Sequence, residues 1–205
     1  MYVQNMTNEE KLVGIYSQKK YLTSADVKDE GIPSWFLSYF VKKNQLIKLA
    51  PGFYASPDWP IDDYFLLQWR YPKFIFSGMS ALSLLGLTEK IVGTMEVTAP
   101  FGYHPCRQAT PHLEIHYERR EDRYAFGIVE KETIFGNKVR VYGYEQTIVD
   151  LIRNRKDYED EVFIKALKGY VRKKDRDTVK LYEYAKLVHS EKAVSDLMEV
   201  VADEN

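Results

Sequence analysis

Residues Ser34 to Lys43 separate into two faces when they are placed on a helix at about 100° per residue. The face that we expect in the core consists of Phe36, Leu37, Phe40 and Val41. The opposite face combines hydroxyl, aromatic and ammonium groups, which are the types that contact base edges and phosphates: Ser34, Trp35, Ser38, Tyr39, Lys42 and Lys43. This pattern predicts a recognition helix that enters the major groove of DNA.

The residues around this helix predict the elements that position it. Thr23 or Ser24 suits the cap of a preceding short helix, and Gly31 suits the position just after its end. Pro33 fits the first turn of the next helix, because its missing N–H is not needed there. Two short strands, 46–49 and 53–55, follow around the turn at Pro51-Gly52, with Lys48 on the first of them. This order of elements is that of a winged helix-turn-helix.

The charge of this segment favours DNA binding locally rather than over the whole chain. Residues 31–57 contain three lysines and no acidic residue. Residues 1–56 carry seven lysines and five acids, a formal charge of +2, whereas the 205-residue chain has a net charge of −1. A local basic patch is sufficient to attract phosphates. Winged helices also serve as protein–protein modules, so the pattern leaves that alternative open.

Three histidines and the single cysteine resemble a set of metal ligands: His104, Cys106, His112 and His116. His112 and His116, however, belong to an alternating segment that predicts a strand. Residues four apart on a strand are separated by about 13 Å, whereas zinc ligands lie about 2 Å from the metal. We therefore expect solvated histidines on a strand, with no bound metal and no cofactor.

The segment Gly78-Met79-Ser80-Ala81-Leu82 begins like the nucleophile elbow of a hydrolase. That motif requires a second glycine where this chain has Leu82, and without it the tight turn is difficult to form. We expect Ser80 to cap or pack a helix rather than to act as a nucleophile. With no phosphate-binding glycine loop and no other catalytic constellation, the sequence predicts no enzymatic activity.

A second group of basic residues lies near the C-terminus. Lys165, Lys168, Arg172 and Arg176 recur at helical spacing, and Lys173 lies beside them. If one helix extends this far, they form a basic stripe (Lys165, Lys168, Arg172, Lys173, Arg176). The stripe is either a solvated face or a surface that binds DNA phosphates, RNA or an acidic partner.

The overall pattern predicts an α+β protein of two domains. A winged helix-turn-helix at residues 1–56 precedes a Pro-containing linker at 55–60, and an α+β domain occupies residues 60–205. This second domain combines a mixed, mostly antiparallel sheet with a helical tail at 158–172, 177–189 and 191–202. One cysteine, a start without a signal-peptide pattern and no long apolar run predict a cytoplasmic protein that does not span a membrane.

Several short motifs, and the order in which they occur, resemble those of the AbiEi antitoxins of type IV toxin–antitoxin systems. Within the winged helix these are Tyr21-Leu22-Thr23, Gly31-Ile32 and Pro51-Gly52-Phe53-Tyr54. Further along the chain come the remaining motifs: Ser80-Ala81-Leu82, Gly86-Leu87, Thr147-Ile148-Val149-Asp150-Leu151, Ala166-Leu167 and Tyr184-Ala185. The chain departs from the family pattern at Gln146, where arginine is common, and at Phe53, where valine is common.

This resemblance implies a transcriptional autorepressor that binds inverted repeats in its own promoter. It also implies an antitoxin, with a C-terminal domain that counters a nucleotidyltransferase-like toxin without necessarily forming a stable complex with it. Two other functions stay open from the sequence. One is a winged-helix regulator of another operon, with a C-terminal sensing or dimerisation domain. The other is an enzyme with a winged-helix appendage.

Overall fold

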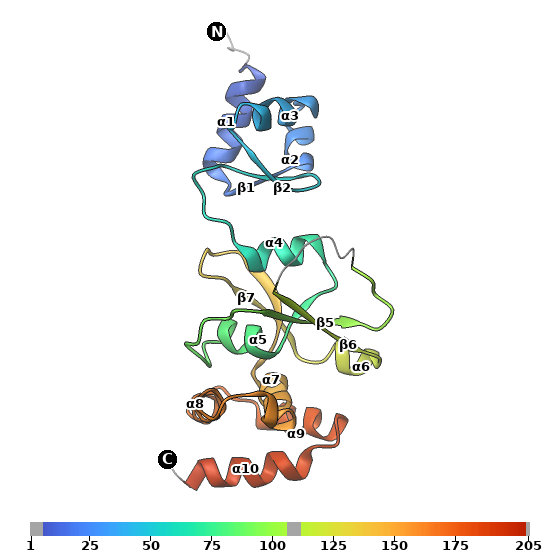
Figure 1. Ribbon diagram of the computed structural model, residues 1–205, viewed down its shortest axis with the longest axis vertical. Helices are drawn as coiled ribbons and strands as arrows, with labels where there is room; N and C mark the ends of the chain where they lie inside the picture. The colour runs from blue at the N-terminus through green and yellow to red at the C-terminus, as the bar shows by residue number, and fades with distance from the viewer. Residues whose placement is uncertain (1–5, 106–111, 204–205) are drawn as a thin grey trace. The chain divides into compact units, whose positions relative to one another are not determined.

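The computed structural model describes residues 6–105 and 112–203 and shows a mixed α+β chain with two sheets (Figure 1). The chain divides into two compact units, residues 1–66 and residues 67–205. The division falls within helix α4 (Asp63–Arg70), a few residues after the linker predicted at 55–60. No described helix is long and apolar enough to cross a lipid bilayer.

The N-terminal unit packs three helices against a small antiparallel sheet of order β1-β3-β2. Its elements before α4 are α1 (Asn8–Gln18), β1 (Tyr21–Thr23), α2 (Ser24–Asp29), α3 (Trp35–Lys42), β2 (Ile47–Ala50) and β3 (Phe53–Ala55). Fully buried Leu12, Leu22 and Phe40 are among the side chains that hold the helices to the sheet. This arrangement is compatible with a winged helix-turn-helix.

Local signals in the sequence explain where these elements begin and end. Thr23 caps α2 as predicted, since its hydroxyl accepts a hydrogen bond from the Asp26 backbone N–H while the Asp26 carboxylate accepts one from the Thr23 N–H. Gly31 follows the C-terminal cap of α2 and has a φ of 71°. Gly52 lies in the β2–β3 turn and has a φ of 69°. Pro33 lies just before the Ser34 cap of α3 rather than in its first turn.

The C-terminal unit contains a five-stranded sheet of order β6-β5-β4-β8-β7. Its strands are β4 (Ile75–Phe76), β5 (Met95–Pro100), β6 (Leu113–Glu118), β7 (Ile128–Glu132) and β8 (Lys138–Tyr142). The helices after α4 are α5 (Gly78–Leu84), α6 (Glu121–Tyr124), α7 (Tyr144–Arg153), α8 (Asp160–Val171), α9 (Thr178–Leu187) and α10 (Glu191–Asp203), with the short 3-10 helix η1 (Arg155–Asp157). Within this unit, α7 to α10 form a helical layer on one side of the sheet (Figure 1).

The sheet is mixed, as predicted, but the expectation that it is mostly antiparallel is wrong. The pairs β4–β5 and β7–β8 are antiparallel, but β4–β8 and β5–β6 are parallel. Parallel neighbours need a crossover of roughly a dozen residues, and the chain between Pro100 and Leu113 has that length. The alternating pattern of side chains locates each strand but does not fix its direction.

The helical tail packs through small and aromatic residues that the sequence motifs contain. Ala166 and Ala185 are fully buried where α8 and α9 join a common core with α7 and α10. Thr147 closes the turn from β8 into α7, because its hydroxyl donates a hydrogen bond to the Tyr142 carbonyl over 3.2 Å. These contacts hold the helices to one another and fix the start of α7 beside the end of β8.

Candidate functional sites

The exposed face of α3 is the first candidate site. All six polar and aromatic residues predicted for it are exposed, and Trp35 retains 62% of its accessible surface. On the other face, Leu37 and Phe40 are buried, and Phe36 and Val41 are half-buried. The separation of the helix into a core face and a solvent face is therefore confirmed, while its contact with DNA stays a prediction.

Two basic groups extend this surface. Lys43 places its ammonium group 4.5 Å from the centre of the Tyr39 ring, and a hydrogen bond with that side chain raises the pKa of Lys43. Lys48 is exposed on β2, the first strand of the predicted wing. Residues 31–57 contain no acidic residue that would oppose a phosphate at these positions. The surface thus combines positive charge with aromatic rings and hydroxyl groups.

His104 follows β5, whereas His112 directly precedes β6 with a φ of 64°. His116 is on β6, with its Nε2 atom 3.6 Å from a Glu96 carboxylate oxygen and 3.8 Å from one of Glu114. The neighbouring Glu96 carboxylate raises the pKa of His116. Within 6–105 and 112–203, no three His, Cys, Asp or Glu side chains are placed to hold a metal ion. Cys106 lies outside the described residues, so the absence of a metal stays a prediction.

Ser80 has the packing role expected from its sequence context. It is fully buried, and its Oγ accepts a hydrogen bond from the Glu96 backbone N–H over 2.9 Å. Gly78, the first residue of α5, has a φ of 51°. A Cβ atom there would lie 1.7 Å from the Glu96 Oε2 atom. Gly78 therefore gives the Glu96 carboxylate the space it occupies above the start of α5.

The basic stripe is not one continuous helical face. Helix α8 ends at Val171, so only Lys165 and Lys168 lie on it, and Arg172 is its C-terminal cap. Arg176 folds back, with its guanidinium donating to the carbonyls of Val171 and Lys173. Lys165 pairs with Glu89 over 2.9 Å, and Lys173 pairs with Asp175 over 3.0 Å. Binding by these residues stays a prediction, now for a shorter and partly paired cluster.

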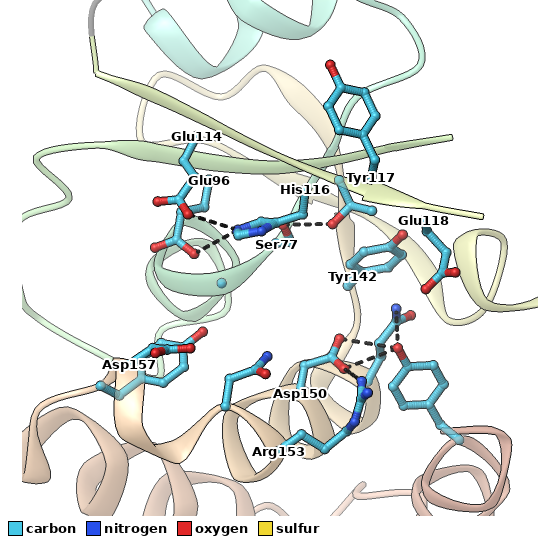
Figure 2. Close-up of a pocket in the computed structure, with 16 residues that line it drawn as sticks. Ser77, Glu96, Glu114, His116, Tyr117, Glu118, Tyr142, Asp150, Arg153 and Asp157 are labelled. Carbon is cyan, nitrogen blue, oxygen red and sulfur yellow. Dashed lines mark hydrogen bonds and ion pairs between the residues drawn. The ribbon is translucent and has the colours of Figure 1, made fainter. Parts of the chain in front are cut away.

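A polar pocket of about 310 Å³ lies within the C-terminal unit, between the sheet and the helical layer (Figure 2). Strands β5 and β6 supply one wall, and α7, η1 and α9 supply most of the other. Its ionisable side chains apart from tyrosine are Glu96, Glu114, Glu118, Asp150, Asp157, His116 and Arg153. The lining also includes four tyrosines and four uncharged polar residues: Tyr117, Tyr142, Tyr158, Tyr184, Ser77, Thr98, Gln146 and Asn154.

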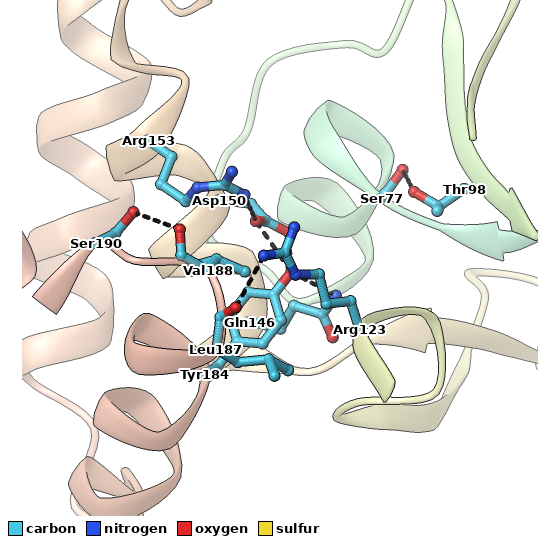
Figure 3. A network of polar contacts seen from close by, with 10 residues as sticks. All are labelled: Ser77, Thr98, Arg123, Gln146, Asp150, Arg153, Tyr184, Leu187, Val188 and Ser190. Atoms are coloured by element: carbon cyan, nitrogen blue, oxygen red, sulfur yellow. Dashed lines mark hydrogen bonds and ion pairs between the residues drawn. The ribbon is translucent and has the colours of Figure 1, made fainter. Parts of the chain in front are cut away.

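Asp150 lies at the centre of a polar network in the floor of this pocket (Figure 3). The Tyr184 hydroxyl lies 3.2 Å and 3.3 Å from its two carboxylate oxygens, and the Arg153 guanidinium donates over 3.3 Å. The Gln146 amide nitrogen donates in turn to the Tyr184 hydroxyl over 3.1 Å. The network places one carboxylate and one neutral amide on neighbouring turns of α7.

The surroundings of Asp150 disfavour its charge. Although 28% of its side-chain surface opens to the pocket, protein groups surround the carboxylate, and this desolvation raises its pKa to about 6. The charge of Arg153 and the hydrogen bond from Tyr184 act in the opposite direction without cancelling the effect. Asp150 is therefore a perturbed carboxyl group in a cleft, a combination that marks candidate binding sites.

We expect Asp150→Asn to change how stability depends on pH. A folded pKa of about 6 exceeds the ordinary value of about 4, so the folded state binds more protons in this window and its stability falls as pH rises through it. The asparagine keeps an oxygen for Tyr184 and removes the charge. Relative to the wild type, the variant should gain about 1–3 kcal/mol of unfolding free energy between pH 4 and pH 7.

Urea unfolding at several pH values measures this difference. The control is Asp196→Asn, which removes a charge from the exposed surface of α10. If the difference in unfolding free energy between wild type and Asp150→Asn stays constant from pH 4 to pH 7, the raised pKa of Asp150 is contradicted.

This pocket was not predicted from the sequence, although part of its signal is visible there. Glu114, His116 and Glu118 alternate along one strand, which places them on one face, whereas the ligand pattern in the sequence consists of the histidines and Cys106. Glu96 and Asp150 come from distant parts of the chain and reach the pocket only through the tertiary fold. No local pattern links them.

Comparison with solved structures supports the fold. The crystal structure of the RV2827C protein from Mycobacterium tuberculosis matches with a TM-score of 0.65 and 13% identity, covering 97% of this chain and 78% of that chain. At this identity the likeness shows a shared fold alone. No curated protein matches the chain.

One family model matches a segment near the N-terminus. Residues 17–57 match a family described as "Transcriptional regulator, AbiEi antitoxin". The match spans β1 to β3 and includes the whole exposed face of α3. The resemblance to AbiEi antitoxins noted from the sequence motifs is therefore confirmed over residues 17–57.

Proposed function

We propose that the chain is a DNA-binding transcriptional autorepressor and the antitoxin of an AbiE-like type IV toxin–antitoxin system. In this proposal the N-terminal unit is a winged helix-turn-helix that binds inverted repeats in the chain's own promoter. The observation that carries the proposal is the coincidence of two features in residues 17–57: the family match and the acid-free exposed face of α3.

The side chains on this surface divide into two roles. Lys42 and Lys48 are exposed amines on α3 and β2, suited to phosphate contacts that position the protein without reading sequence. Ser38 and Tyr39 lie on the same exposed face of α3 and suit contacts with base edges in the major groove. Trp35 at the start of the helix adds a flat apolar surface.

The C-terminal unit has the second role in this proposal, opposition to a nucleotidyltransferase-like toxin. It has a core of its own, built around α7 to α10, and the described part of its helical layer carries the cluster at Lys165, Lys168 and Arg172. Such an antitoxin acts in the cytoplasm, where both the promoter and the toxin are present. Neither role requires a catalytic residue in this chain.

Gel shifts with DNA from upstream of the chain's own gene test the DNA-binding part. We expect Lys42→Ala and Lys48→Ala each to weaken binding to all sequences and to lower the salt slope by about one unit. Ser38→Ala and Tyr39→Ala should instead alter the preference among sequences. The control is Lys192→Ala, an exposed amine on α10. Unchanged salt slopes in both lysine variants would refute the assigned phosphate contacts.

A further inference from the structure

The pocket in the C-terminal unit has an excess of negative charge. Five carboxylates line it, from Glu96, Glu114, Glu118, Asp150 and Asp157, against the single guanidinium of Arg153. His116 is the other basic group, and it already interacts with Glu96 and Glu114. The concave walls concentrate this negative potential in a cavity whose size suits a small molecule.

The spacing of the carboxylates favours an organic cation over a metal ion. A divalent cation needs several oxygens within about 2.0–2.6 Å of one point. Across residues 6–105 and 112–203 no three acidic or histidine side chains are arranged in that way. The carboxylates are instead distributed around a pocket of about 310 Å³, as a larger cation with several N–H donors requires.

The other side chains in the pocket complement such a ligand. The rings of Tyr142, Tyr158 and Tyr184 offer aromatic surface, which attracts cations and packs against alkyl chains. Gln146, which also lines the pocket, holds the Tyr184 hydroxyl through a hydrogen bond from its amide nitrogen.

We propose that this pocket binds a small organic cation that carries amine or guanidinium groups. The carboxylates of Asp150 and Glu114 accept hydrogen bonds from its N–H groups on opposite walls. The tyrosine rings contact its carbon chain. The ligand bridges β6 and α7, so its binding holds the helical layer to the sheet within the C-terminal unit. This site is additional to the proposed DNA-binding surface and does not depend on it.

Calorimetric titration of the full chain with agmatine, which carries an amine at one end and a guanidinium at the other, tests the proposal. We expect saturable binding and a melting temperature that rises with agmatine concentration. Glutarate, an anion with a similar carbon chain, should give neither effect. Magnesium chloride alone should not reproduce the response, because the described part of the pocket lacks a metal-binding arrangement.

Two pocket variants and one control separate the site from general charge effects. Asp150→Asn and Glu114→Gln should each weaken agmatine binding roughly 10- to 100-fold, as expected for a charged hydrogen bond. Glu114 is 60% exposed, so its replacement leaves the core intact. The control is Glu130→Gln, which removes a carboxylate of similar exposure from β7, outside the pocket. Absence of binding by the folded wild type, equal affinity in all variants, or a response to magnesium alone would overturn the proposal.

Discussion

Replacing Gly78 by alanine is expected to cause a large loss of stability in the C-terminal unit. Gly78 has a φ of 51°, and an added Cβ would lie 1.7 Å from Glu96 Oε2 and 2.6 Å from Glu96 Cδ. The left-handed conformation costs about 1–2 kcal/mol with a side chain, and overpacking costs about 1–3 kcal/mol. We expect the free energy of unfolding to fall by about 2–4 kcal/mol, because the Glu96 carboxylate can partly move away.

Two other glycines of the same unit separate the contributions. Gly86 has a φ of 71° and nothing within 4 Å of its added Cβ, so Gly86→Ala reports the backbone cost alone. Gly93 has open space and no positive φ, so Gly93→Ala should be nearly neutral. Urea unfolding followed by circular dichroism measures all three. If Gly78→Ala lowers the free energy of unfolding no more than Gly86→Ala does, the close approach of Glu96 adds nothing to the cost of the substitution.

The largest functional effect is expected from reversing the charge of Lys42 and Lys48 together. In the full chain, Lys42→Glu with Lys48→Glu should abolish repression, because two phosphate contacts become repulsive. The same variant should still rescue cells from the toxin, since the proposal assigns rescue to the C-terminal unit. A promoter–reporter assay measures repression, and a growth assay with inducible toxin measures rescue.

The converse variant reverses the charges of Lys165, Lys168 and Arg172. It should reduce rescue or cooperative operator binding while the circular dichroism spectrum stays unchanged, because Lys165 and Arg172 are exposed and Lys168 is half-buried, and surface charges contribute only about 0–1 kcal/mol each. If it rescues and represses like the wild type, these residues form only a solvated surface. If the Lys42 and Lys48 variant loses rescue while folded, the division of roles between the units is wrong.

The N-terminal unit was predictable because its signals are local. Thr23, Gly31 and Gly52 each determine a cap or turn within a few residues, and the period of α3 separates Leu37 and Phe40 from the exposed residues. These features depend on hydrogen bonds and sterics between near neighbours. They therefore do not depend on distant parts of the chain.

The features that could not be predicted from the sequence depend on contacts between distant residues. The parallel pairing of β5 with β6 and the meeting of Glu96, His116 and Asp150 in one pocket require the complete sheet and helical layer. The basic residues do not form one continuous helical face, and the reason is different. Helix α8 ends at Val171, and Asp177 begins α9 by accepting a hydrogen bond from the Lys180 backbone N–H.

Footprinting of the full chain on the DNA upstream of its own gene is the decisive test of operator binding. We expect protection of an inverted repeat, with two half-sites protected symmetrically, and loss of that protection in the Lys42→Glu, Lys48→Glu variant. The proposed function is contradicted if the folded wild-type chain protects no site at low ionic strength, or if the variant protects the same site as strongly as the wild type.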